Sequence, residues 1–171
     1  MGRALAAGRV PGLPSRRQRF SIVTEPRTID EFRASFPLQR EHEAEFGEID
    51  MNQHVNNVRY AVWTETLRGI FFADVIQAEI NGPTGIVMAK HELHYEGMVR
   101  YRERVAIGGR VSRWGTKSFD FTCEVWSLAT GARVFRGIAT LVAFDYVANA
   151  SIAIPAVWRE RVAAHAGASS V

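Results

Sequence analysis

The sequence predicts an α+β domain in which one long helix packs against an antiparallel sheet. Apolar residues recur at three- and four-residue spacing over residues 57–76, as in a helix with one buried side. Residues 85–144 instead contain four strand-like segments, and turn-like stretches separate most of them. Because short turns join antiparallel neighbours, the helix is expected to cover one face of the resulting sheet with its apolar stripe.

The first 27 residues form a basic arm. Residues 1–24 contain five arginines and no acid, so they carry +5, and the rest of the chain carries −2 within a net charge of +3. A content rich in Gly, Ala, Pro and Arg predicts disorder in this arm. Arg-rich, acid-free starts also occur in mitochondrial transit peptides, although Pro11 and Pro14 would interrupt an amphipathic helix. Since the body is not basic, no nucleic-acid partner is expected.

A short helix over residues 28–35 and a strand within residues 36–46 are expected to precede the long helix. The long helix begins near Asn57, and either Asn56 or Asn57 can cap its first turn by accepting a backbone N–H. Glycine and proline at residues 82–85 end the helical region. The residues on its predicted buried stripe are Tyr60, Trp63, Leu67, Ile70, Phe71 and Asp74.

The predicted strands lie at residues 85–96, 103–111, 118–125 and 133–144. The third has the clearest alternation, with one face formed by Phe119, Phe121, Cys123 and Val125. The last is apolar on both faces, as a central strand should be. A final helix over residues 155–165 starts at Pro155, which is a favourable first helical position.

The length of 171 residues suits one domain, which we place at residues 28–150, with a C-terminal helix and tail at 151–171. No apolar run is long enough to cross a bilayer, so no membrane partner is expected. The single cysteine, Cys123, excludes an intrachain disulfide and indicates a reducing cytoplasm, with organelle targeting through the basic arm as the alternative.

No metal or cofactor is expected. His91 and His94 lie on opposite faces of their strand, and no cluster of cysteines or acids accompanies them. No glycine-rich phosphate-binding loop follows any predicted strand, so a nucleotide-dependent reaction is not indicated.

Residues 50–60 read DMNQHVNNVRY and concentrate hydrogen-bonding groups directly before the apolar helix. Asp50, Asn52 and His54 are spaced by two, so an extended backbone would direct all three side chains to one side. A carboxylate can act as base or nucleophile, an imidazole can transfer protons, and an amide can hold water or a carbonyl oxygen. The N–H groups at the helix start suit a developing oxyanion. These groups match the hydrolysis of an activated acyl group.

A structural interpretation of the same residues is also open. Asp50 and Asn52 both favour turns, and His54 could be a core histidine with both ring nitrogens hydrogen-bonded. Spacing alone does not separate this interpretation from catalysis.

The segment DMNQHVNNVRYAVWTE resembles the signature of hotdog-fold acyl thioesterases. It is especially similar to the Asp-x-Asn-x-His-Val-Asn-Asn pattern of plant-type acyl-ACP thioesterases, which continues with Tyr, Trp and Glu. It is also similar to the broader signature of single-domain bacterial acyl-CoA thioesterases. The later segment GTKSFDFTCEV, at residues 115–125, resembles a strand entry of that family.

This resemblance implies a single hotdog fold, in which an antiparallel sheet of about five strands wraps around the long helix. It implies that Asp50, Asn52 and His54 form the catalytic set. Plant-type enzymes add a further acid on their second long strand. Here Glu96 and Glu103 are both near that position, and the closest alignment places Met98 there.

The resemblance also implies an assembly. Plant-type enzymes carry two hotdog units in one chain, whereas this chain has room for one. A homodimer with active sites at the subunit interface is therefore expected, with a homotetramer as an extension. The substrate would be a thioester of coenzyme A or of an acyl-carrier protein, and the single-domain length favours coenzyme A.

The candidate substrate-binding residues are Asn57, Tyr60, Trp63, Glu65, Arg113 and Lys117. The two aromatic residues are either core or the wall of an acyl pocket, and Glu65 either supports the catalytic residues or lies on the helix surface. The two cations could meet the phosphates of coenzyme A or an acidic carrier protein, or they could belong to a solvated strand face.

Two other functions remain open at this stage. The first is an acyl-thioester hydratase or dehydratase on the same fold. The second is a non-catalytic acyl-binding protein, which would have no need of a base beside an oxyanion site. Fold alone does not separate these from a thioesterase.

Overall fold

The computed structural model describes residues 28–79 and 82–168, so the basic arm lies outside the described residues. The strands are β1 (Leu38–Glu43), β2 (Thr84–Tyr95), β3 (Arg104–Trp114), β4 (Ser118–Ser127), β5 (Arg133–Asp145) and β6 (Ala150–Ser151). The helices are α1 (Ile29–Ser35), α2 (Asn57–Ile70) and α3 (Ala156–Ala168), with a 3-10 turn η1 (Phe46–Glu48) and a π-helical segment η2 (Phe71–Ile76).

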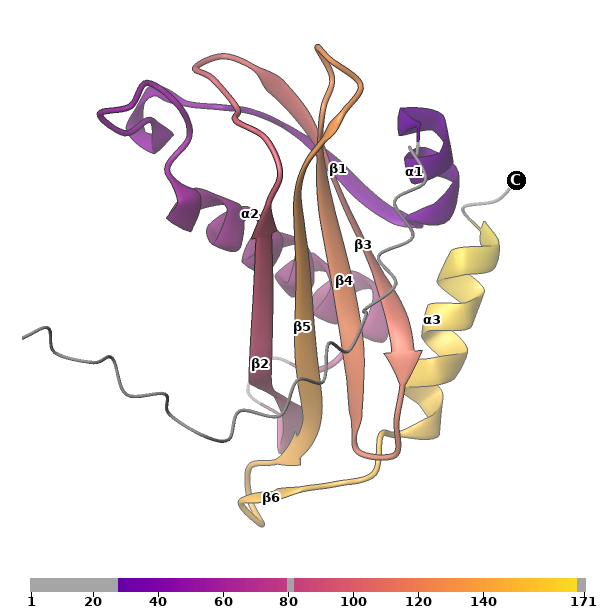
Figure 1. The fold of residues 1–171 in the computed structure, drawn as a ribbon. Coiled ribbons are helices and arrows are strands. Elements are labelled where there is room, and N and C mark those ends of the chain that lie inside the picture. Colours follow the sequence, from indigo (N-terminus) through magenta and orange to yellow (C-terminus); the bar gives the residue numbers. More distant parts are fainter. Residues whose placement is uncertain (1–27, 80–81, 169–171) are drawn as a thin grey trace, which may run out of the picture.

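The strands form one antiparallel sheet in the order β1-β3-β4-β5-β2, and β6 pairs with β5. α2 lies across one face of this sheet, and η2 continues it without a break (Figure 1). This arrangement confirms the predicted α+β class and the single hotdog fold. The predicted helix over residues 57–76 corresponds to α2 and η2 together. β6 is too short to produce a recognisable pattern in the sequence.

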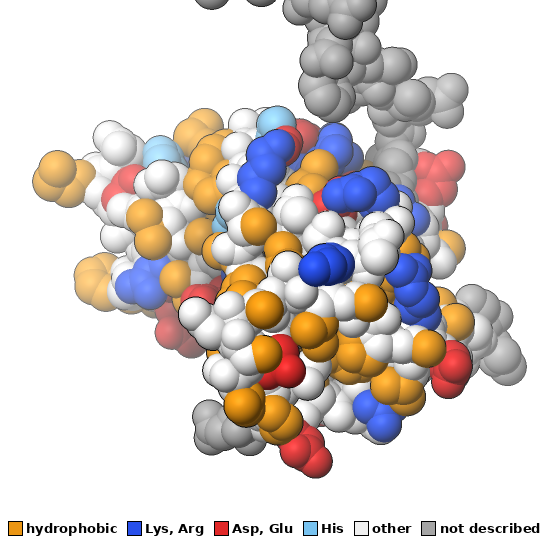
Figure 2. All heavy atoms as spheres, turned by 90° about the horizontal axis from the view of Figure 1, so that it is seen from below, with side chains coloured by type: hydrophobic (Ala, Val, Ile, Leu, Met, Phe, Trp, Pro, Cys, Tyr) orange, Lys and Arg blue, Asp and Glu red, His pale blue; other side chains and the backbone are white. Residues whose placement is uncertain are grey.

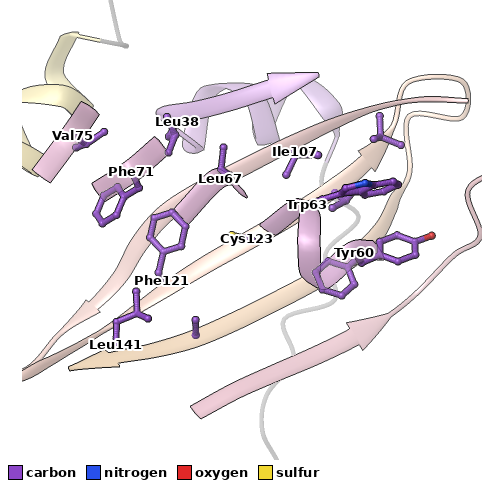
Figure 3. Packing of buried hydrophobic residues seen from close by; sticks show 14 of the residues in the cluster. Leu38, Tyr60, Trp63, Leu67, Phe71, Val75, Ile107, Phe121, Cys123 and Leu141 are labelled. Atoms are coloured by element: carbon purple, nitrogen blue, oxygen red, sulfur yellow. The ribbon is translucent and has the colours of Figure 1, made fainter. Parts of the chain in front are cut away.

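The buried side of α2 forms the centre of the core. Tyr60, Trp63, Leu67 and Phe71 follow the helical period and are each at most 5% exposed. They pack in one cluster with sheet residues labelled in Figure 3, which are Leu38, Ile107, Phe121, Cys123 and Leu141. Cys123 is the small core residue that its alternation with phenylalanines predicts. Burial raises the pKa of its thiol to about 12.

A glycine on β3 allows α2 to approach the sheet closely. A Cβ atom on Gly109 would lie 2.5 Å from the ring of Phe121 and 2.9 Å from the side chain of Leu67. Real side chains do not tolerate such distances, so the absence of a side chain at residue 109 sets the depth at which Leu67 packs.

The two terminal helices cover other parts of the sheet. Phe32 on α1 and Phe36, the residue that caps the end of α1, form a second, small cluster with Ala106 and Trp126. α3 brings Trp158 into the main core. Arg161 on α3 donates a 2.6 Å hydrogen bond to the Ile76 carbonyl at the end of η2. The C-terminal helix therefore packs on the same core as the predicted domain 28–150.

β2 is an edge strand of the single chain. It pairs with β5 on one side, and no strand of the described ranges pairs with its other side. Its register shifts between Met88 and Lys90, and Met88 is 51% exposed. An unpaired strand edge with exposed apolar side chains is a surface at which a second chain can add.

Candidate active site

The Asp50 loop is the tip of a small hairpin that leads into α2. The Asp50 N–H donates to the His54 carbonyl at 3.0 Å, and the Gln53 N–H donates to the Asp50 carbonyl at 3.0 Å. Ile49 and Val55 form a β-bridge below this turn. Gln53 has a φ of 64°, which is the left-handed region. The stretch is therefore a tight turn, and the extended backbone considered from the two-residue spacing is not observed.

The turn nevertheless brings two of the three predicted catalytic side chains together. Asp50 Oδ2 lies 3.8 Å from His54 Nδ1, and the two side chains are 21% and 28% exposed. Asn52 contributes its main chain, since its N–H donates to Asp50 Oδ1 at 2.8 Å, while its side chain is exposed. A partly buried carboxylate is thus fixed beside an imidazole, and both remain accessible to a ligand.

The start of α2 and the β2–β3 connection hold this turn in place. Asn56 is the N-cap of α2, because its Oδ1 accepts the Val58 N–H at 3.0 Å. The Val55 N–H donates to the Val99 carbonyl at 2.7 Å. The hydroxyl of Tyr95 donates to the Asn57 carbonyl at 3.3 Å. Asp50 therefore lies just before the positive end of the helix dipole.

Tyr60 and Trp63 are buried anchors of this region. Tyr60 is 2% exposed and stacks on Phe135 at a ring distance of 5.2 Å. Burial raises the pKa of Tyr60 to about 12, so its hydroxyl stays neutral at physiological pH. Trp63 is 5% exposed, and its Nε1 donates to Glu48 Oε1 at 2.6 Å. In the single chain both rings contribute to the core.

Glu48 is a residue that the sequence does not single out, although it connects three elements beside the Asp50 loop. Its Oε1 accepts the hydrogen bond from Trp63 on α2. Its Oε2 lies 2.8 Å from His42 Nε2 on β1 and accepts a hydrogen bond from the Glu45 N–H at 2.9 Å. Partial burial alone would raise the pKa of Glu48. The hydrogen bonds from His42, Glu45 and Trp63 outweigh burial and hold the pKa below its ordinary value.

No sequence pattern identifies this network, because its members lie on different elements. The Glu48 carbonyl also accepts the Asn56 N–H at 2.9 Å, which closes the base of the hairpin. Glu48 therefore fixes the loop through both its side chain and its main chain.

The three residues near the expected position of a fourth catalytic acid do not contact Asp50. Glu96 is paired with Arg133, with an Nε–Oε2 distance of 2.8 Å. Glu103 accepts hydrogen bonds from the Ser127 hydroxyl and from the Arg100 N–H. Met98 is 62% exposed. None of these three residues has a described contact with Asp50, so the described part of the single chain offers no further acid at this position.

The structure places the two predicted cations far from Asp50 within one chain. Arg113 lies near the end of β3, and its Nε lies 2.6 Å from Asp120 Oδ2 in an ion pair. Lys117, in the β3–β4 turn, donates to the Ser151 carbonyl at 3.0 Å. The Asp50 loop adjoins the opposite end of β3, roughly 30 Å away along the strand. Figure 2 views the molecule from this far end, where apolar and charged side chains are intermixed.

The other candidates lie on exposed parts of α2. Asn57 occupies the first helical position and is exposed, and Glu65 is exposed two turns further along. In the described ranges no group of three or more His, Cys, Asp or Glu side chains is arranged to hold a metal ion. A search of the same ranges finds no helix that is long and apolar enough to cross a membrane.

Comparisons with known proteins show which folds and which family this chain is similar to. The chain is 24% identical to a thioesterase-superfamily protein from Jannaschia sp. CCS1, covering 84% of this chain and 95% of that one with a TM-score of 0.69. It is 24% identical to a Thermus thermophilus thioesterase complexed with coenzyme A and Zn, covering 77% and 96% with a TM-score of 0.67. It is 21% identical to the PA5185 protein of Pseudomonas aeruginosa PAO1, covering 77% and 93% with a TM-score of 0.69.

These solved structures share the fold, and no curated protein sequence matches the chain. The sequence signature of the thioesterase-like superfamily matches residues 44–162, which include the Asp50 loop, α2 and the sheet strands β2 to β6. The chain therefore belongs to the thioesterase-like superfamily.

Proposed function

We propose that the protein hydrolyses acyl-CoA thioesters to a free acid and coenzyme A, with Asp50 as the catalytic carboxylate. The observation that carries this proposal is the Asp50–His54 pair, 3.8 Å apart, directly before the capped start of α2. The T. thermophilus structure, which contains coenzyme A, supports this carrier over an acyl-carrier protein.

The reaction can follow two routes from this geometry. In the first, Asp50 takes a proton from water while the water oxygen attacks the thioester carbon, the C–S bond breaks, and the thiolate is protonated. In the second, an Asp50 oxygen attacks the carbon, the C–S bond breaks and the thiolate leaves and is protonated; water then hydrolyses the resulting anhydride to the free acid and the Asp50 carboxylate. In either route the positive end of α2 stabilises the negative charge on the carbonyl oxygen.

His54 and Asn52 have supporting roles in this proposal. The His54 imidazole lies close enough to orient water or to polarise the carbonyl. The exposed amide of Asn52 is free to turn toward a bound substrate. Asn57, at the first helical position, and Glu65 on the same helix are proposed to contact the substrate. Tyr60 and Trp63 would shape the acyl site from beneath.

We further propose that the active unit is a homodimer, or a tetramer of two such dimers, in the cytoplasm. The free edge of β2 supports this assembly, since a second chain can extend the sheet there. Arg113 and Lys117, which are remote from Asp50 within one chain, would then act only if the partner subunit brings them to its neighbour's site.

The test is thiol release from acyl-CoA substrates of increasing chain length, with wild-type protein and Asp50→Asn. We expect release by the wild type and a loss of at least about a hundredfold in kcat for the variant, because the amide cannot accept a proton. Circular dichroism should show that the variant stays folded. Near-normal hydrolysis by Asp50→Asn would exclude Asp50 as the catalytic group. Water addition to enoyl-CoA without thiol release would indicate a hydratase. The absence of both reactions would indicate a binding protein.

A further inference from the structure

Arg68, in the last turn of α2, is a buried cation that forms no ion pair in the described part of the chain. It is 8% exposed, and its Nη1 is buried without a hydrogen-bond partner in the same ranges. A buried charge is stable only when an anion or several hydrogen-bond acceptors surround it. The position of Arg68 therefore indicates a partner that residues 28–79 and 82–168 do not supply.

The groups around Arg68 on the sheet do not provide an anion. Burial lowers the pKa of His91 on β2, the charge of Arg68 adds to this and Glu65 opposes it, so the neutral imidazole is favoured and offers no negative charge. On β4 the nearby Cys123 thiol is protonated, since burial raises its pKa to about 12. The adjacent positions of β5 are Gly137, which pairs with Cys123, and Ala139, which pairs with His91. Neither of these two residues carries a charge.

Arg68 lines a cavity of about 280 Å³ between α2 and the β2–β5 strand pair. The other lining residues are Glu65, Gly69, Phe72, Ile86, Met88 and Leu141. Gly69, Phe72 and Ile86 also line an adjoining cavity of about 680 Å³, which extends along η2. Volumes of this order hold small-molecule ligands. The combined space is mainly apolar, with one buried cation in its wall and the exposed Glu65 at its rim.

We propose that this space binds the acyl part of a thioester whose chain carries a second carboxylate, and that Arg68 binds this carboxylate. The inference rests on the proposed thioesterase function and narrows its substrate class to dicarboxylic acyl thioesters. A guanidinium can bind a carboxylate through two parallel N–H···O bonds, which a hydroxyl or keto group cannot match in charge. The methylene chain would pack against Phe72, Ile86 and Leu141.

The kinetic test compares chains of equal length with and without a terminal carboxylate. The substrates are adipoyl-, suberoyl- and sebacoyl-CoA against hexanoyl-, octanoyl- and decanoyl-CoA. For at least one length we expect the wild type to prefer the carboxylated chain by about ten- to a hundredfold in kcat/KM, the range of a charge-assisted hydrogen bond. In Arg68→Met this ratio should fall to about one, because the variant keeps an apolar side chain and loses the cation. Arg68→Lys should keep part of the preference.

A matched control is Arg33→Met, which removes an exposed arginine on α1 and should keep the wild-type ratio. A wild type that prefers the unsubstituted chain, or treats both alike at every length, contradicts the proposal. Arg68 would then find its counter-charge in Glu65 or in a partner subunit. This outcome is read from the wild type alone, so it does not depend on the folding of any variant.

A binding measurement separates this inference from the proposed function. Suberate and its dimethyl ester, which has the same chain without charge, are titrated into wild type and Arg68→Met by calorimetry. Tighter binding of suberate by the wild type, lost in the variant, supports the Arg68 site even if no thioester is hydrolysed. If the wild type binds suberate no better than the ester, the Arg68 site is wrong even if thioester hydrolysis is observed.

Discussion

The carboxylate of Glu48 anchors the Asp50 loop to the neighbouring elements. It joins His42 on β1 to Trp63 on α2, while its carbonyl closes the hairpin through Asn56. The conformation of the turn matters because Gln53 is held in the left-handed region, which a residue other than glycine adopts at a cost. Loss of these anchors would let the turn relax and move Asp50 away from the start of α2.

Replacing Glu48 should therefore affect the reaction more than binding. We expect Glu48→Ala to lower kcat by about ten- to a hundredfold, since small displacements of a reacting group carry penalties of this order. KM should change less, because no substrate contact is removed. Glu48→Gln should recover part of kcat, since its amide oxygen can still accept from Trp63. An unchanged kcat in Glu48→Ala, measured by thiol release, would show that the loop holds its shape without this anchor.

The same residue should contribute to the pH dependence of stability. The pKa of Glu48 lies below its ordinary value of 4.5, so folding favours the ionised form. This contribution is fully present above pH 4.5 and is lost as the pH falls through the lower pKa of the folded state. Urea unfolding of wild type and Glu48→Gln at pH 7 and pH 3 should show a larger loss for the wild type on acidification. Equal losses would mean that the ionisation of Glu48 contributes nothing to the pH dependence of stability.

At the scale of elements, periodicity accounts for most of the fold. The buried stripe of α2 and the alternation in β4 follow from residues close in sequence, so both could be predicted, although Asp74, which is predicted to lie on that stripe, is exposed. The capping role of Asn56 could be predicted for the same reason. Asp50 and Asn52 favour a turn, but the conformation of this turn could not be predicted, since it depends on the hydrogen bond from Val55 to Val99 and contains no glycine or proline. The hydrogen bonds of Glu48 also join residues that lie on different elements, so they could not be predicted either.

Replacing either of two glycines by alanine should change the free energy of unfolding, in opposite directions, and so tests the helix–sheet packing. Gly109→Ala places a methyl group against Phe121 and Leu67 and should lower the free energy of unfolding by about 1–3 kcal/mol, the usual effect of overpacking. Gly69 lies on the exposed side of α2, where a methyl group would have nothing within 4 Å, so Gly69→Ala should raise it by about 0.5–1 kcal/mol. Denaturant unfolding measures both. A neutral Gly109→Ala would mean that α2 can shift away from the sheet.

At the scale of the whole molecule, the proposed dimer would resolve the separation of the candidate site residues. Asp50 lies near one end of the sheet, and Arg113 and Lys117 lie near the other. If two β2 edges pair antiparallel, the opposite ends of neighbouring subunits approach each other. One chain can then supply the carboxylate and its partner the cations, which would explain why the described part of a single chain shows no complete site.

Disrupting the β2 edge should therefore separate the subunits. Met88→Glu places a charge on the exposed edge strand, and we expect the protein to become monomeric because charges on an edge strand oppose its pairing with a second strand. Sedimentation equilibrium measures the change. Val147→Glu, at an 82% exposed position in the β5–β6 turn, is the matched control and should remain dimeric. A monomeric wild type, or a dimeric Met88→Glu, would contradict the assembly.

Because Cys123 is buried, its rate of alkylation can report how often the hydrophobic core opens. This thiol is the only one in the sequence, and it lies at the centre of the sheet beneath α2. With its pKa raised to about 12, it carries almost no thiolate at neutral pH, and reagents cannot reach it in the closed state. Alkylation of the unmodified protein should therefore proceed only during opening of the core. Its rate would measure how often α2 lifts from the sheet, and any ligand that bridges the two should slow it.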